Sequence, residues 1–364
     1  MVIAGYAPSL VNFRGPLLRA MVARGHEVLG AAPDLDPDTR AMLCSLGVLP
    51  VPVMMKRRGL NPLSDLASLV SLSNVMVKMK PDLVLAYTVK PVIYGMLAAR
   101  WAGVSTRVAL VTGLGHAFAR ASGGAGVLAR WSLRVALKRA HLVILQNPDD
   151  REFLVSRGYV SDVRAVVVDG SGVDLEHFAA APLHSGPTVF LSIARLLSDK
   201  GVREFVAAAR TVMGSYPDTQ FRLVGPIVGV KDAVTREELE EWMRDGLVSY
   251  AGELQDVRPE LRAAHVFVLP SYYGEGTPRS VLEAMATGRA IITTDMPGCR
   301  ETVREGHNGF LVPPRDVSAL ENAMRRFLEE PSLTERMGAA SLEMVRTRYD
   351  VNDVNADMLA HLQL

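Results

Sequence analysis

Cysteine is scarce in this sequence, with only Cys44 and Cys299 among 364 residues. Two widely separated cysteines fit neither a disulfide framework nor a zinc-binding pattern. We therefore expect both thiols to be reduced, as they are in the cytoplasm.

Long hydrophobic runs are also missing, although hydrophobic residues make up 49% of the chain. No run reaches the roughly 18 apolar residues of a membrane-spanning helix, and the apolar part of residues 1–15 is too short for a signal peptide. No nucleic-acid-binding module is found. No Asp-x-Asp pair lies in a loop suited to a metal ion. These absences predict a cytoplasmic protein without a membrane span.

The net charge is nearly zero as well, at +1, but the two halves of the chain differ. Residues 1–168 hold 20 Lys and Arg against 10 Asp and Glu, a charge of +10. Residues 169–364 hold 20 against 29, a charge of −9. Such a split predicts an anionic partner for the first half, and a membrane surface fits better than nucleic acid.

Strand-like and helix-like segments alternate along the whole chain, which is typical of parallel α/β sheets. One series of strands runs from residue 2 to residue 145, and a second begins near residue 188. Because 364 residues exceed one ordinary domain, we expect two doubly wound, Rossmann-like domains facing each other across a cleft. The predicted boundaries are 1–168 for the first domain and 169–341 for the second, followed by a helix over 342–364.

The segment after the buried strand expected at 264–270 is the most informative part of the chain. Thr277 is a good N-cap and Pro278 fits the first helical position, so a helix is predicted over 280–287 and ended by Gly288. A helix that starts after a strand presents free backbone N–H groups to an anion such as phosphate. An ordinary strand–loop–helix turn is the alternative interpretation.

Charged side chains lie in this turn and also after an earlier predicted strand. Glu275 and Glu283 can accept hydrogen bonds from the paired hydroxyls of a sugar or ribose. Arg195 and Lys200 follow an earlier predicted strand, where two cations can neutralise a diphosphate. Ordinary solvated surface charges are the alternative for both pairs.

These motifs together resemble a known enzyme family. Residues 275–314 are similar to the E-x7-E region of retaining glycosyltransferases of the GT-B fold, in the large GT4 family, with Ala290 where proline is usual. Residues 192–201 resemble the G-R-L-x-x-x-K-G phosphate-binding motif of that family, with Ala194 in the glycine position. In that fold the last helix crosses back to the first domain, a role that the resemblance gives to residues 342–364.

The resemblance implies a set of site residues, for each of which a structural role is the alternative. Catalytic roles fall on Glu275, His116, Arg195 and Lys200. Binding of the nucleotide-sugar donor falls on Gly15, Arg195, Lys200, Leu254, Gly276, Thr277, Pro278 and Glu283. Contacts with the acceptor fall on Lys90 and Asn147. No cofactor and no metal are implied, because the UDP-sugar is a co-substrate.

Several segments narrow the resemblance to bacterial enzymes that extend polyprenyl-diphosphate-linked sugars. The implied reaction moves a hexose or N-acetylhexosamine, by preference N-acetylgalactosamine, from a UDP-sugar to a lipid-linked saccharide. Two alternatives remain open. One is a UDP-GlcNAc 2-epimerase of the same fold, and the other is a non-catalytic protein that binds a nucleotide sugar.

A basic amphipathic stretch over residues 117–139 predicts how the first half contacts its partner. Arg130, Arg134 and Lys138 alternate there with apolar residues, a pattern typical of helices that lie on anionic membranes. We therefore expect a peripheral protein at the inner face of the bacterial cytoplasmic membrane. A core-packing helix with a solvated basic face is the alternative.

Overall fold

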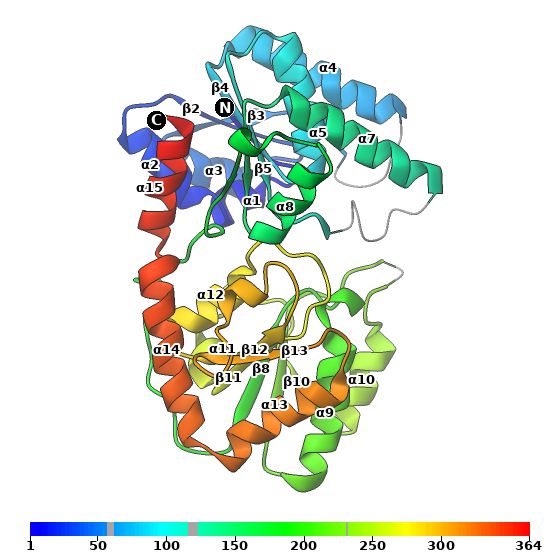
Figure 1. Ribbon diagram of the computed structural model, residues 1–364, viewed down its shortest axis with the longest axis vertical. Coiled ribbons are helices and arrows are strands. Elements are labelled where there is room, and N and C mark those ends of the chain that lie inside the picture. Colours follow the sequence, from blue (N-terminus) through cyan, green and yellow to red (C-terminus); the bar gives the residue numbers. More distant parts are fainter. Residues whose placement is uncertain (57–61, 116–122, 231) are drawn as a thin grey trace. The chain divides into compact units, whose positions relative to one another are not determined.

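The computed structural model describes residues 1–56, 62–115, 123–230 and 232–364 (Figure 1). These residues form two compact units. The first unit consists of Met1–Ser171 together with Val351–Leu364, and the second is the continuous segment Gly172–Asp350. None of the described helices is long and apolar enough to cross a lipid bilayer.

The first unit is built on a parallel sheet, in which seven strands are described in the order β3-β2-β1-β4-β5-β6-β7. The strand order reverses between β1 and β4, which is the switch point where doubly wound folds bind ligands. The strands are β1 (Val2–Ile3), β2 (Val28–Ala32), β3 (Val48–Pro52), β4 (Leu83–Tyr87), β5 (Thr106–Val111), β6 (Leu142–Leu145) and β7 (Ala165–Val167).

Helices cover both faces of this sheet, and each face has its own hydrophobic core. One core takes residues from α4 (Pro62–Met79), α5 (Val89–Trp101), α7 (Gly123–Arg139) and α8 (Pro148–Ser156). The other takes residues from α1 (Pro8–Asn12), α2 (Gly15–Ala23), α3 (Pro37–Ser45) and α15 (Val351–Leu362). Figure 1 shows α15, in red, beside α2.

The second unit repeats this plan with a parallel sheet in the order β10-β9-β8-β11-β12-β13. Its strands are β8 (Val189–Ile193), β9 (Gln220–Val224), β10 (Ser249–Tyr250), β11 (Val266–Leu269), β12 (Ala290–Thr294) and β13 (Gly309–Val312). Its helices are α9 (Val202–Ser215), α10 (Arg236–Arg244), α11 (Arg258–Ala263), α12 (Arg279–Ala286), α13 (Val317–Glu329) and α14 (Ser332–Arg348). The prediction of two α/β units with parallel sheets is thus confirmed.

The helix predicted over 342–364 is interrupted in the structure. Helix α14 ends at Arg348 and α15 begins at Val351. Between them Tyr349 is fully buried, and its hydroxyl donates a hydrogen bond to the carbonyl oxygen of Glu301 at 2.7 Å. Its own carbonyl accepts the N–H of Val173 at 2.9 Å. These contacts draw the backbone out of the helix, so the second unit ends at Asp350 and not at residue 341.

A buried arginine fixes the segment that enters the second unit. Arg289 is fully buried and donates to the carbonyl oxygens of Ala264 at 2.9 Å and of Ala181 at 2.5 Å. Burial lowers the pKa of Arg289 to about 10. Burying a charged guanidinium is unfavourable, and the hydrogen bonds to carbonyl oxygens offset part of this cost. The same hydrogen bonds connect residues 181–182 to the end of α11.

Two histidines lie beside this arginine. His265 accepts the backbone N–H of Val189 on Nδ1 at 3.1 Å, so its Nε2 carries the hydrogen and donates to the carbonyl oxygen of His184 at 3.1 Å. Burial lowers the pKa of His265 and outweighs the opposing effect of the hydrogen bond to the His184 carbonyl, while the charges of His184 and Arg289 also lower this pKa. The packed structure therefore favours a neutral ring at His265.

Candidate functional site

The carboxyl ends of β8 and β11 carry the predicted motifs, and one glycine brings them together. After β8 the chain passes Arg195, forms a 3-10 turn over Ser198–Lys200 and enters α9. Gly201 has a φ of +72°, and a Cβ there would lie 2.1 Å from the carbonyl oxygen of Pro270. Only glycine permits this close approach.

Side chains from the two motifs meet at this contact. Nζ of Lys200 forms an ion pair with Oε1 of Glu275, and both side chains are nearly buried, with exposures of 12% and 13%. Ser271 donates to the same carboxylate oxygen at 3.0 Å, and Lys200 lies 4.9 Å from the ring centroid of Tyr273. The structure thus joins two motifs that are 75 residues apart in the sequence.

The loop before α12 differs in one detail from the prediction. Pro278 is the N-cap, with a φ of −71° and a ψ of 115°, and the helix begins at Arg279. The prediction that Thr277 caps the helix is wrong, because the extended ψ of Pro278 moves the helix start one residue along. Thr277 and Gly276 are buried in the loop. The C-terminal prediction is confirmed, since Gly288 follows the helix with a φ of +77°.

Glu283 lies one turn into α12, where its carboxylate is 3.2 Å from Nη2 of Arg279. Burial raises the pKa of Glu283, although the charge of Arg279 acts in the opposite direction. A carboxylate removed from water and paired on one side is suited to accept hydrogen bonds from neutral hydroxyls. Arg279 was not predicted as part of this site, although its i, i+4 spacing to Glu283 is visible in the sequence.

Arg195 follows β8 and Leu254 follows β10, the two strands on either side of β9. Arg195 is half-buried, and among the described residues its guanidinium has no hydrogen-bond partner. Beside it Gly225 has a φ of +135°, and a Cβ there would lie 1.9 Å from the carbonyl oxygen of Ala194. Leu254 is partly buried and packs against the core under α12.

Two residues that the sequence did not single out support the acidic loop. Gly298 has a φ of +85°, and a Cβ there would lie 2.0 Å from the carbonyl oxygen of Gly276. Cys299 is fully buried, and burial together with the charge of Glu275 raises the pKa of its thiol to about 12. The thiol therefore stays protonated. The turn at 297–299, rich in small residues, was the signal in the sequence for this close packing.

Three of the residues predicted in the first unit, Gly15, Lys90 and Asn147, lie at the starts of three different helices. Gly15 begins α2, where a Cβ would meet only Leu46 at 3.7 Å, so the fold itself does not demand glycine. Lys90 lies in the first turn of α5 with Nζ 3.3 Å from Oδ1 of Asp65. His116 lies outside the described residues.

Asn147 has a clear structural role. It is the N-cap of α8 and is fully buried. Its Oδ1 accepts the backbone N–H of Asp150 at 2.7 Å, and its Nδ2 donates to Oδ2 of Asp150 at 3.0 Å. These capping contacts explain an asparagine at this position without any contact to an acceptor substrate.

The second unit can thus bind an anion, and next to it carboxylates can accept hydrogen bonds from hydroxyl groups. Lys200, Arg195 and the start of α12 offer positive charge and N–H donors. Glu275 and Glu283 offer carboxylate oxygens. Within the described residues, no group of three or more His, Cys, Asp and Glu side chains is placed to hold a metal ion.

Comparison with protein families gives matches over both units. Residues 187–330 match the family model described as glycosyl transferases group 1. Residues 13–170 match that of a glycosyl transferase 4-like domain. The motifs at Arg195, Lys200, Glu275 and Glu283 all lie within the first of these matches.

Two curated relatives are similar over most of the chain. The N,N'-diacetylbacillosaminyl-diphospho-undecaprenol alpha-1,3-N-acetylgalactosaminyltransferase of Campylobacter jejuni is 30% identical, over 94% of this chain and 93% of the relative. The UDP-Gal:alpha-D-GlcNAc-diphosphoundecaprenol alpha-1,3-galactosyltransferase of Escherichia coli is 29% identical, over 76% of this chain and 74% of the relative.

Solved structures share the fold at low sequence identity. HepE of Anabaena in complex with UDP has a TM-score of 0.79 and 20% identity, over 100% of this chain and 98% of the other. Sucrose-phosphate synthase of Thermosynechococcus elongatus has a TM-score of 0.82 and 18% identity, over 100% of this chain and 97% of the other. The expected GT-B fold is thereby confirmed.

Proposed function

Because the chain belongs to the group 1 glycosyltransferases, we propose that it is a retaining enzyme of polyprenyl-linked glycan assembly. It moves a hexose or N-acetylhexosamine from a UDP-sugar to a saccharide held on a polyprenyl diphosphate. N-Acetylgalactosamine is the preferred donor sugar, because a relative named for that transfer is 30% identical over 94% of the chain.

The contact between Lys200 and Glu275 is the observation that carries this proposal. A UDP-sugar needs a cation at its diphosphate and an acceptor for its sugar hydroxyls within a few ångströms of each other. Lys200 and Arg195 supply the positive charge, and the N–H groups at the start of α12 add donors. Glu275 binds the transferred sugar, and Glu283 accepts hydrogen bonds from the ribose.

In the proposed reaction the acceptor hydroxyl attacks the anomeric carbon on the face that the diphosphate leaves. The new bond from carbon to oxygen forms as the bond to the phosphate oxygen breaks, and a phosphate oxygen takes the hydroxyl proton. Negative charge develops on the departing UDP, so Arg195 and Lys200 bind the transition state more tightly than the ground state. We assign His116 to a hydrogen bond with the transferred sugar.

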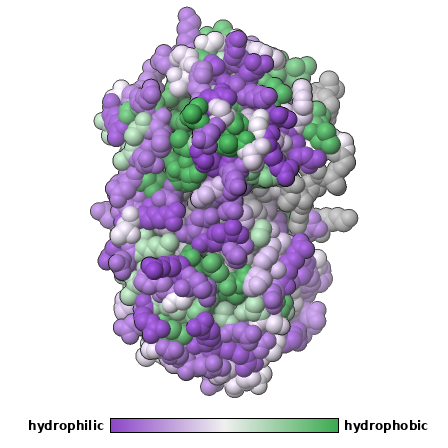
Figure 2. Space-filling model, viewed as in Figure 1, coloured by the Kyte–Doolittle hydropathy of each residue, from purple (hydrophilic) through white to green (hydrophobic). Residues whose placement is uncertain are grey.

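The acceptor is lipid-linked in this proposal, so the first unit would lie at a membrane surface. Helix α7 buries Leu133 and Leu137 in the core but exposes the apolar side chains of Val127, Leu128 and Trp131. Exposed Arg134 and Lys138 follow on the same helix. On the face drawn in Figure 2, hydrophobic and hydrophilic residues are interspersed over this unit.

Helix α4 adds to this surface a feature that the sequence analysis did not identify. Its side chains Leu66, Val70 and Val77 are exposed at 55%, 47% and 59%, at a spacing that places them along one side of the helix. Helices α4 and α7 both pack against α5, on the same face of the sheet. This layer of helices combines apolar and basic groups, which are the groups that bind an anionic lipid surface. We assign it to the inner face of the cytoplasmic membrane.

Roles at the acceptor stay proposals for Lys90 and Asn147. Lys90 is paired with Asp65, so an acceptor diphosphate would have to replace that carboxylate. Asn147 is occupied by its capping contacts with Asp150.

The direct test incubates the purified protein with a lipid-linked saccharide and a panel of UDP-sugars, and measures UDP release and extension of the lipid-linked glycan. Release that depends on the lipid acceptor supports the transferase. Conversion of UDP-GlcNAc without any lipid would instead identify the 2-epimerase. UDP binding without turnover on any acceptor would identify a non-catalytic binding protein.

A further inference from the structure

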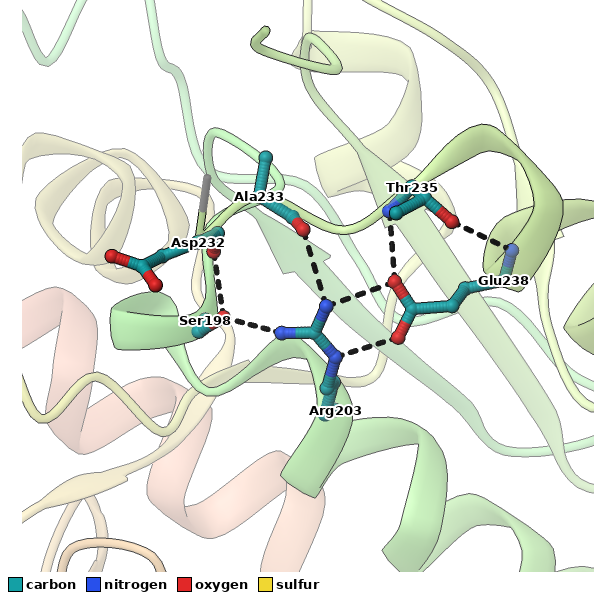
Figure 3. Close-up of polar contacts among 6 residues, drawn as sticks. All are labelled: Ser198, Arg203, Asp232, Ala233, Thr235 and Glu238. Atoms are coloured by element: carbon teal, nitrogen blue, oxygen red, sulfur yellow. Dashed lines mark hydrogen bonds and ion pairs between the residues drawn. The ribbon is translucent and has the colours of Figure 1, made fainter. Parts of the chain in front are cut away.

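An ion pair between Arg203 and Glu238, outside the motifs, holds the loop that carries Arg195 and Lys200 (Figure 3). Arg203 lies in the first turn of α9, and its guanidinium meets the carboxylate of Glu238 on α10 with two hydrogen bonds. Nε is 2.7 Å from Oε1, and Nη2 is 2.8 Å from Oε2. This parallel, two-bond geometry is the strong form of an arginine–carboxylate contact.

The same guanidinium also contacts the loop itself. Nη1 of Arg203 donates to the hydroxyl of Ser198, which lies between Arg195 and Lys200. That hydroxyl donates in turn to the carbonyl oxygen of Asp232 at 2.6 Å, and Nη2 of Arg203 donates to the carbonyl oxygen of Ala233 at 3.1 Å. One side chain thus ties the loop after β8 to the segment before α10.

Backbone hydrogen bonds align these two segments. The N–H of Ser198 donates to Asp232 at 2.9 Å, and the N–H of Val234 donates to Leu196 at 2.9 Å. An antiparallel bridge pairs Leu197 with Ala233. On its other side the loop is held by the acidic motif, since the N–H of Tyr272 donates to the carbonyl oxygen of Asp199 at 2.9 Å.

Glu238 also caps helix α10, which restricts the position of its carboxylate. Thr235 and Glu238 form a capping box at the start of α10, with the N–H of Thr235 2.8 Å from Oε2 of Glu238. The hydrogen bonds from Arg203 hold the pKa of Glu238 below its ordinary value, and Glu238 raises the pKa of Arg203. Both groups are charged at neutral pH, so the ion pair between Arg203 and Glu238 is present at neutral pH.

From this geometry we infer that Arg203 is a positioning residue for donor binding, which holds the loop at 195–200 in the shape that binds the diphosphate. The inference rests on the proposed function. Arg203 does not touch the donor itself, and it acts through Ser198 and the segment at 232–235. Its removal should therefore loosen the diphosphate contacts while the rest of the fold stays intact.

The test compares UDP affinity by calorimetry in the wild type, Arg203→Ala, Arg203→Lys and Glu238→Gln. We expect Arg203→Ala to weaken UDP binding on the order of tenfold, equivalent to about 1.4 kcal/mol. Arg203→Lys keeps the charge but loses the two-bond geometry, so it should weaken binding by less. In turnover assays the donor KM should rise while the acceptor KM stays constant, a split that a loss of folded protein would not produce.

Arg210→Ala is the matched control, because Arg210 lies on the same helix α9 and pairs with Asp245 just after α10, at 3.1 Å. That pair is exposed and remote from the loop at 195–200, so UDP affinity should change by no more than about twofold. An equal loss of UDP affinity in Arg203→Ala and Arg210→Ala would overturn the inference.

Two further outcomes separate this inference from the proposed function. A folded Arg203→Ala variant with the UDP affinity of the wild type overturns the positioning role alone. If that variant does not fold, unchanged UDP affinity in both Arg203→Lys and Glu238→Gln does the same. A wild-type protein that binds no UDP overturns the donor assignment, and the positioning role with it.

Discussion

At the scale of single residues, the ion pair between Lys200 and Glu275 shows how closely packed backbone brings two distant segments together. Lys200 and Glu275 were each predicted from their own motif, and nothing local in either motif indicates that they pair. The contact depends on Gly201 and Gly298, whose positive φ angles allow backbones to approach each other. Such packing is a property of the fold and not of either motif.

The positive charge of Arg195 and Lys200 should be needed mainly as the leaving UDP develops charge. We expect Arg195→Ala or Lys200→Ala to lower turnover by roughly 10² to 10³, as the loss of one oxyanion-hole donor does. Steady-state kinetics with the native acceptor measures this. Arg325→Ala, which breaks an i, i+4 pair on α13, is the control. Turnover near the wild-type level in both site variants would contradict the assignment.

Glu283 should bind the nucleotide part of the donor. Glu283→Gln keeps the shape of the side chain but removes its charge, so UDP alone should bind more weakly, by on the order of tenfold for a charge-assisted hydrogen bond. Glu321→Gln on α13 is a matched control, because Glu321 also pairs with an arginine at i, i+4 spacing. Calorimetry with UDP decides the matter. If both folded variants bind UDP like the wild type, Glu283 has a structural role.

Because burial raises the pKa of Glu283, the pH dependence of UDP affinity offers a second measurement. Protonation removes an acceptor, so affinity should fall as the pH falls, and the decline should begin above the pH at which an ordinary carboxyl titrates. Glu283→Gln should lack this part of the profile.

At the scale of helices and strands, periodicity located the elements well but missed what their ends and exposed sides do. The start of α12 was misplaced by one residue, because Thr277 and Pro278 both have acceptable sequence patterns for a helix start and the ψ of Pro278 decides between them. The apolar side of α4 was missed because its exposure depends on which residues α5 covers. Sequence periodicity alone does not distinguish a solvent-exposed apolar stripe from a core-facing one.

Helix α7 should be required for membrane binding if the proposed surface is correct. Reversing Arg130, Arg134 and Lys138 to Glu should abolish flotation with liposomes that contain anionic lipid, while UDP affinity stays intact. Added salt should weaken the flotation of the wild type, because it screens the attraction. Activity on a water-soluble acceptor should survive, and activity on the lipid acceptor should fall.

A matched variant controls for overall charge. Arg19, Arg100 and Arg157 are exposed in the same unit but lie outside α4 and α7, so reversing them changes the net charge equally. This variant should keep most of its flotation. Equal flotation of the α7 variant and the wild type would show that the membrane surface lies elsewhere.

At the scale of the whole molecule, alternation of strands and helices predicted two parallel-sheet units, and it placed the junction between them close to Ser171. The return of the chain to the first unit could not be located from periodicity. Residues 342–364 are predicted as one helix, but the structure interrupts it where Tyr349 is buried and accepts the N–H of Val173. How the two units face each other stays a prediction.

The stability of the second unit should depend on pH through His265. Burial, His184 and Arg289 lower the pKa of its ring in the fold, so the unfolded chain takes up a proton more readily. Stability is therefore full above the unfolded histidine pKa of about 6.5 and is lost as the pH falls below it, by at most about 1.4 kcal/mol per pH unit for one proton.

Urea unfolding at several pH values measures this dependence. His265→Asn offers an oxygen in place of Nδ1 but does not titrate, so its stability should fall less steeply between pH 7 and pH 5. The same slope in both proteins would contradict the assignment to His265.

The division of the chain into units also sets an order of folding during synthesis. The second unit is one continuous segment whose ends are neighbours, since Val173 and Asp350 form a bridge. The first unit begins earlier on the ribosome but cannot complete its core until Met358, Leu359 and Leu362 of α15 emerge. The unit that is started first is therefore finished second, and until then the surface of α2 that α15 covers is open to chaperones.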